Sequence, residues 1–265
     1  MNIISASRRT DIPHYYAEWF RERRRAGYAE YRTVYGGGRT GAFRASLAAD
    51  DVLGYLFWTK YAGPFHGELD ALRAEGMPYV FHYTISGYGE DLQPGIPSRD
   101  HAIHDFLRIA DGLPDAASIQ WRYDPILVSP GHDGTWHRKN FEEIAKRLKG
   151  AVHVVNVSFV EPYLKALSKA PDWKGIVWRR PDPGRHGTLL KNYPGLRAAG
   201  IDEELLLADL STIAREQGME LRVCCNPEYS AHHPVASCCG PEMFKPYGES
   251  LLKSVSTLAA NPSRP

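Results

Sequence analysis

The sequence lacks any long apolar run. No segment approaches the roughly 20 consecutive apolar residues that a membrane-spanning helix needs, and the first residues lack the apolar stretch and cleavage site of a secretory signal. We therefore expect a cytoplasmic protein that has no membrane partner. The chain also lacks an excess of charge, with a formal net charge of +1 over 265 residues. No global field therefore indicates nucleic acid as a partner.

Cysteine is scarce and confined to one segment. The four cysteines form two adjacent pairs near the C-terminus, which does not fit the disulfide framework of a small secreted domain. The Cys-x-x-Cys spacing of structural zinc sites is also missing. Thiolates and imidazoles are nevertheless the ligands that zinc and iron prefer. The candidate metal ligands are Cys224, Cys225, His232, His233, Cys238 and Cys239.

Two interpretations of this segment stay open. In the first, one thiol of each pair and one histidine hold a zinc or iron ion, because the side chains of adjacent cysteines diverge and chelate one ion poorly. In the second, the thiols only pack in the interior or in a loop.

Hydrophobic residues make up 43% of the chain and charged residues 24%, which is typical of a single globular domain with a full core. Apolar runs of strand length alternate with amphipathic stretches of helical length. The predicted strands are Ile3–Ile4, Glu30–Tyr35, Leu53–Trp58, Tyr79–Ile85, Ile119–Tyr123, His153–Phe159 and Glu220–Cys224, with Ile176–Trp178 left unassigned. The predicted helices are Tyr15–Arg25, Glu68–Glu75, Asp100–Ala110, Phe141–Leu148, Tyr163–Lys169 and Asp202–Gln217. Pro13 predicts a turn before the first of them, because it disfavours helical geometry for Ile12.

This alternation predicts an α/β fold. The leading architecture is one (β/α) barrel domain of the TIM type over residues 1–265, complete or incomplete, with seven or eight strands and a Cys/His-containing segment at 224–239. A doubly wound open sheet is the alternative.

Charged side chains follow several of the predicted strands, where parallel α/β folds collect their ligand-binding groups. The candidate catalytic residues are Arg8, Arg9, Asp11, Lys60, Arg122 and Asp124. Asp11 or Asp124 can act as a base, and an arginine can stabilise developing negative charge. The excess of cations favours a small substrate that carries a phosphate or carboxylate group. The alternative is that these side chains pair with nearby carboxylates and only brace loops.

Polar and aromatic residues close to the same strand ends are candidates for contacts with the substrate. Asn156 and Ser158 share one face of their strand by its two-residue period. The full set is Ser5, Ser7, Trp58, Thr59, Thr84, Tyr88, Asn156 and Ser158.

Five stretches resemble the bacterial domain-of-unknown-function family 1848, from Ser5 to about Cys239. They are Ser5–Pro13 (SASRRTDIP), Phe57–Lys60 (FWTK), Tyr83–Gly89 (YTISGYG), Trp121–Ile126 (WRYDPI) and the pair Cys224-Cys225. The resemblance implies a TIM-like barrel grouped with radical-SAM proteins of the spore photoproduct lyase type.

Members of that family commonly carry a C-terminal CxxxCxxC run that is expected to hold a four-iron–four-sulfur cluster. This sequence has no cysteine after Cys239, so we do not expect an Fe–S cluster with S-adenosylmethionine here. Two functions therefore stay open. The first is a barrel enzyme acting on a small anion with or without a Cys/His-bound metal, and the second is a non-catalytic relative that binds a small anion or a partner protein.

Overall fold

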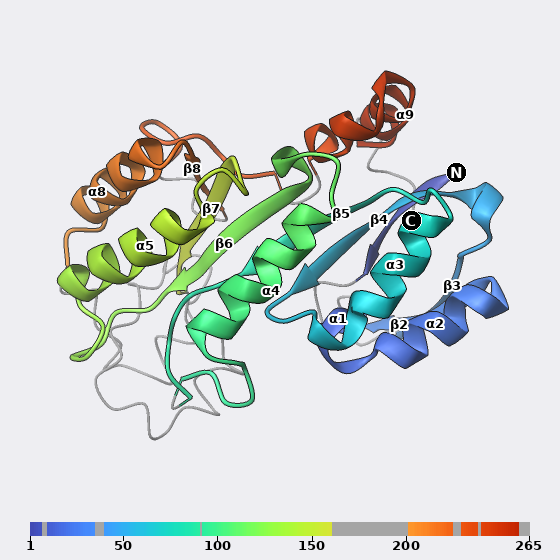
Figure 1. Ribbon diagram of the computed structural model, residues 1–265, viewed down its shortest axis with the longest axis horizontal. Helices are drawn as coiled ribbons and strands as arrows, with labels where there is room; N and C mark the ends of the chain where they lie inside the picture. Colours follow the sequence, from blue (N-terminus) through green and yellow to red (C-terminus); the bar gives the residue numbers. More distant parts are fainter. Residues whose placement is uncertain are drawn as a thin grey trace. The chain divides into compact units, whose positions relative to one another are not determined.

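A computed structural model describes residues 1–6, 10–34, 40–90, 92–160, 201–224, 229–237 and 240–259 (Figure 1). The chain forms two compact units. Unit 1 comprises Met1–Thr84, His104–Ile119 and Cys239–Pro265, and unit 2 comprises Ile85–Ile103 and Gln120–Cys238.

The fold is α/β, with a six-stranded parallel sheet and helices. Unit 1 contains β1 (Asn2–Ala6), α1 (Ile12–Tyr15), α2 (Ala17–Ala26), β2 (Tyr28–Val34), β3 (Thr40–Ser46), β4 (Val52–Thr59), α3 (His66–Ala74), β5 (Tyr79–Thr84), the 3₁₀ helix η5 (Pro241–Tyr247) and α9 (Glu249–Ala259). Unit 2 contains β6 (Ile119–Ile126) from Gln120 onward, α5 (Gly134–Leu148), β7 (Val154–Phe159), α8 (Glu203–Glu216) and β8 (Glu220–Val223). Helix α4 (Arg99–Asp111) contributes its first turn to unit 2 and the rest to unit 1.

Strands pair in parallel within each unit. In unit 1 the order is β1-β4-β5, and in unit 2 it is β6-β7-β8. Closure of these strands into a TIM-type barrel of seven or eight strands is not confirmed and stays a prediction. The predicted helix Tyr163–Lys169 and the apolar run Ile176–Trp178 lie outside the described residues.

One predicted strand has a different role. Glu30–Tyr35 was expected to extend the parallel sheet, but β2 pairs with β3 in an antiparallel hairpin that forms its own two-stranded sheet. The register runs from Tyr28 opposite Ser46 to Val34 opposite Thr40. A connection this short permits only antiparallel pairing, because a parallel crossover needs a dozen residues or more. The prediction was therefore wrong for this strand.

One face of the strands in unit 1 packs against helix α2. Tyr55 and Phe57 of β4 are buried, and the ring of Phe20 from α2 lies 5.4 Å and 5.5 Å from their ring centroids. The two-residue period of a strand then sends Gly54, Leu56 and Trp58 to the opposite face.

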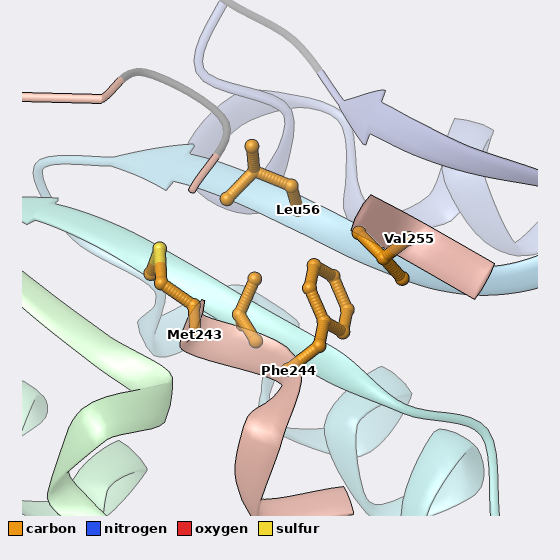
Figure 2. Packing of buried hydrophobic residues seen from close by; sticks show 5 residues of the cluster. Leu56, Met243, Phe244 and Val255 are labelled. Carbon is orange, nitrogen blue, oxygen red and sulfur yellow. The ribbon is translucent and has the colours of Figure 1, made fainter. Parts of the chain in front are cut away.

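The C-terminal segment covers part of this opposite face. Met243 and Phe244 of η5 and Val255 of α9 are buried against Leu56 and Val80, as Figure 2 shows. Gly54 allows this close packing, because a Cβ atom there would lie 2.9 Å from Cε1 of Phe244. The segment from η5 to α9 therefore contributes to the core of unit 1.

In unit 2, α5 and α8 cover one face of the strands (Figure 1). The ring of Trp121 from β6 lies 4.7 Å from that of Phe141 on α5. Helix α5 begins at Gly134, one and a half to two turns before the predicted start at Phe141. Its buried stripe opens with the polar residues His137 and Asn140, so apolar periodicity alone detects only its second half.

No helix in the described part of the chain is both long and apolar enough to cross a bilayer.

Candidate functional site

Polar side chains share one face of β6 and β7 in unit 2. Trp121 and Tyr123 of β6 contact Phe141 of α5, so the intervening residues of the strand turn to the other face. In the parallel register, Arg122 lies opposite Asn156, which lies opposite Arg222 of β8. The face that does not contact α5 is therefore polar, and it carries four of the predicted site residues: Arg122, Asp124, Asn156 and Ser158.

Asp124 is the centre of a hydrogen-bonded network on this face. Nε of Arg122 donates to its Oδ2 at 3.1 Å, and Nη2 of Arg122 donates to the same oxygen. The hydroxyl of Ser158 donates to Oδ1. Both carboxylate oxygens of Asp124 are thus held, one by a cation from its own strand and one by the neighbouring strand.

The thiol of Cys224 extends this network. Cys224 directly follows β8 and is buried, and its Sγ lies 3.9 Å from Nη2 of Arg122. Burial alone would lower the pKa of Arg122, but Asp124 and Cys224 favour the cation and raise its pKa above the ordinary value. The guanidinium is therefore charged, and it lies beside the buried thiol of Cys224. We call Arg122, Asp124, Ser158 and Cys224 the strand-end cluster.

Asn156 lies beside this cluster and is fully buried. Its Nδ2 donates to Oε1 of Gln120 at 2.7 Å. Its Oδ1 accepts no hydrogen bond within the described part of the structure. Asn156 thus offers an acceptor next to the cluster.

Tyr88 has a bracing role in this structure. Its hydroxyl donates to the carbonyl oxygen of Pro125 and accepts from the backbone N–H of Leu127, both at 2.8 Å. Burial raises the pKa of Tyr88 well above its ordinary value. These bonds tie the loop after β5 to the end of β6, and a contact of Tyr88 with substrate stays a prediction.

Asp11 of unit 1 caps a helix. Its carboxylate accepts from the backbone N–H of His14 at 3.0 Å, from the hydroxyl of Thr59 at 2.8 Å and from the backbone N–H of Lys60 at 2.7 Å. Burial raises the pKa of the Asp11 carboxyl, although these three hydrogen bonds oppose the shift. The structure thus brings together Asp11, Thr59 and Lys60, in contacts that join the start of α1 to the end of β4.

The helix that Asp11 caps was not expected. The sequence favoured a turn at Pro13 followed by a helix over Tyr15–Arg25, whereas α1 starts at Ile12 and α2 follows at Ala17. Proline is tolerated in the first turn of a helix, where the backbone N–H groups have no partner within the helix. The prediction of a turn there was wrong for this reason.

The remaining candidates of unit 1 lie along β1, β4 and β5. Nε1 of Trp58 donates to the hydroxyl of Ser5 at 3.2 Å, and the indole stacks on the ring of His82 at 4.2 Å. Thr84 ends β5 and is half-buried. Ser7, Arg8 and Arg9 lie outside the described residues.

The predicted metal ligands are only partly described. His233 is buried with Nε2 3.7 Å from a carboxylate oxygen of Glu204, and His232 is exposed. No three His, Cys, Asp or Glu side chains of the described residues are grouped as metal ligands. Cys225, Cys238 and Cys239 lie outside the described ranges, so metal binding by this segment stays a prediction.

A buried cluster of polar side chains around Asp105 of helix α4 was not predicted, because the predicted site residues were all sought near strand ends. Asp105 accepts from the backbone N–H of Ala62 and from the hydroxyl of Tyr83, both at 2.7 Å, and lies 2.6 Å from Nε2 of His66. Burial, reinforced by Asp105, raises the pKa of Tyr83 above its ordinary value. In the sequence Asp105 is one polar residue of an amphipathic helix, so no pattern distinguishes it from an exposed one.

The fold and the strand-end cluster define the class as an α/β protein. It holds a buried guanidinium and thiol beside a half-buried carboxylate and hydroxyl where parallel strands end. The model of one family, the domain of unknown function DUF1848, matches residues 3–257, and the chain belongs to that family. The predicted family is thus confirmed, whereas its grouping with radical-SAM proteins stays a prediction. No protein with a curated description matches the chain significantly.

Proposed function

We propose that the chain is an enzyme that acts on a small anionic substrate, carrying a phosphate or carboxylate group, at the strand-end cluster of unit 2. The observation that carries this proposal is the network in which Asp124 is held by both Arg122 and Ser158 while Arg122 also faces the thiol of Cys224. A buried cation that contacts both a carboxylate and a thiol, with a hydroxyl on the carboxylate, is typical of catalytic sites.

This proposal gives a chemical role to four side chains. Arg122 pairs with the anionic group of the substrate and stabilises negative charge that develops during the reaction. Asp124 accepts a proton, and Ser158 orients its carboxylate. The buried Oδ1 of Asn156 accepts a hydrogen bond from a donor group of the substrate.

Titration of the full chain with inorganic phosphate tests the binding step. Arg122→Gln is expected to weaken phosphate binding by about tenfold or more, the effect of losing a charge-assisted hydrogen bond. Arg215→Gln, which removes an equal charge from the last turn of α8, is the matched control and should bind as the wild type does. Equal affinities of wild type and Arg122→Gln would overturn the proposal.

Turnover of p-nitrophenyl phosphate, an ester that carries an anionic group, tests the catalytic step. We expect hydrolysis by the wild type that Asp124→Asn abolishes and Arg215→Gln retains. Phosphate binding that depends on Arg122, together with no turnover of this ester, would instead support the non-catalytic alternative, a small-anion-binding member of the family.

A further inference from the structure

Unit 2 contains a cavity that the proposed catalytic residues do not line. Its volume is about 230 Å³, and it lies among the loop after β5, the start of α4 and the middle of α5. Two cations and one carboxylate line it, which leaves a net positive charge. The lining residues are Gly87, Arg99, Trp136, Lys139, Asn140 and Glu143.

The floor of this cavity is rigid because every polar atom of the Asn140 side chain is used. Nδ2 donates to the carbonyl oxygen of Ser86 at 2.8 Å and to the hydroxyl oxygen of Tyr123 at 3.0 Å. Oδ1 accepts from Nη1 of Arg99 at 2.9 Å. Asn140 is itself buried. Its hydrogen bond therefore fixes the guanidinium of Arg99 at the edge of the cavity.

The charge of Arg99 is already balanced, whereas Lys139 has no ion-pair partner among the described residues. Nη1 of Arg99 lies 2.7 Å from a carboxylate oxygen of Glu143. Lys139 is exposed and forms no ion pair with any residue that the structure describes. An anion in the cavity would therefore neutralise Lys139, with Arg99 as a second donor.

Trp136 supplies an aromatic wall. One face of its indole stacks on the ring of Tyr88, with a centroid separation of 5.5 Å and an interplanar angle of 7°. The Tyr88 hydroxyl is itself bonded to Pro125 and Leu127, so the stack is anchored to the end of β6. This aromatic wall can pack against a planar apolar group of a ligand. A bare inorganic ion has no such group and would not gain from this contact.

We propose that this cavity binds a small organic anion, a planar body that carries one carboxylate or phosphate group. The anionic group lies at Lys139 and Arg99, and the planar body lies against Trp136. The volume agrees with this class of ligand, because a cavity of about 150 Å³ accommodates benzene. The site is separate in its residues from the strand-end cluster and goes beyond the proposed function.

Benzoate is the probe that tests this assignment, with benzamide as its neutral counterpart and inorganic phosphate as the anion without a planar body. Binding to the full chain is measured by calorimetry and by the shift of the indole N–H resonance that Trp136→Phe removes. We expect benzoate to bind and to shift this resonance. Benzamide and phosphate should shift it only at concentrations at least about tenfold higher, the loss of one charged or apolar contact.

Matched variants separate this site from the proposed catalytic one. Lys139→Gln should weaken benzoate binding about tenfold. Lys146→Gln, on the same helix but ion-paired with Glu142, should leave the benzoate-induced shift of the Trp136 resonance unchanged, as should Arg122→Gln. A benzoate-induced shift that survives Lys139→Gln, or that is lost in Arg122→Gln alone, would overturn the assignment. It would also be overturned if phosphate shifted the Trp136 resonance at concentrations as low as benzoate does.

Discussion

Arg122 and Asp124 stand two residues apart on β6 and form an ion pair on the side of the strand away from Phe141. The side chain of Arg122 is 9% exposed and that of Asp124 20%. Charges this far removed from water are costly unless they are paired. The pair is therefore expected to matter for stability as well as for the proposed chemistry.

A double-mutant cycle measures this coupling. Arg122→Ala and Asp124→Ala should each lower the free energy of unfolding by about 2 kcal/mol, because each leaves the other charge buried without its partner. The double variant should lose at least about 1 kcal/mol less than the sum of the two. Urea denaturation gives all four values. As a control, the exposed pair Arg147–Asp100 should show coupling below about 0.5 kcal/mol. A coupling as small in the Arg122–Asp124 cycle would mean that the pair is exposed in solution.

Most of the strand-end cluster could be predicted from the sequence, because side chains alternate between the two faces of a strand. Residues Arg122 and Asp124 share a face by that period, and Ser158 follows from the parallel pairing of β6 with β7. Cys224 joins them because it ends the next strand. Apolar runs likewise gave most helices and strands to within a few residues. The hairpin β2–β3 was missed because strand composition does not state the direction of pairing.

Polar groups on helices were not predictable in the same way. Asn140 and His137 are buried on α5, and Asp105 is buried on α4, yet polar residues on an amphipathic helix are usually exposed. Their burial depends on partners far away in the chain, such as Tyr83 for Asp105 and Ser86 for Asn140. These partners become evident only when the helices are packed against the strands.

The buried imidazole of His137 predicts a loss of stability in acid. Its Nε2 donates to the carbonyl oxygen of Leu127 at 3.0 Å, and its Nδ1 accepts from the hydroxyl of Tyr123 at 2.8 Å. Burial lowers the pKa of His137 from 6.5 to about 4. Between these two values the unfolded chain binds a proton that the folded chain does not, so the free energy of unfolding falls as the pH decreases. The contribution of His137 over this range is at most about 3 kcal/mol.

Urea denaturation at several pH values from 7 to about 4 measures how the free energy of unfolding depends on pH. This range covers the ordinary and the lowered pKa of His137. His137→Gln keeps a donor and an acceptor at this position but cannot titrate, so its free energy of unfolding should fall less steeply than that of the wild type. His101→Gln, at an exposed histidine of α4, should keep the wild-type slope. If His137→Gln showed the same slope as the wild type, His137 would be accessible to protons in the folded state.

A side chain at Gly87 is expected to destabilise the protein through both backbone strain and a steric clash. Alanine variants at other glycines separate the two effects. Its φ is +74°, and a Cβ atom would lie 2.4 Å from Oδ1 of Asn140. Gly150 has a similar φ of +82° but nothing within 4 Å of a Cβ atom, and Gly131 has open space without a positive φ. Gly150→Ala should therefore cost about 1 kcal/mol for the left-handed backbone. Gly131→Ala should change stability by less than about 0.5 kcal/mol.

Gly87→Ala adds a steric conflict to the same backbone cost. Asn140 cannot retreat without breaking its hydrogen bonds to Ser86, Tyr123 and Arg99. The loss should therefore be at least about 2 kcal/mol, the range of overpacking plus backbone strain. Urea denaturation of the three alanine variants measures the difference. Equal losses of unfolding free energy for Gly87→Ala and Gly150→Ala would show that the Asn140 side chain can move aside. That result would contradict a rigid Asn140 in the cavity.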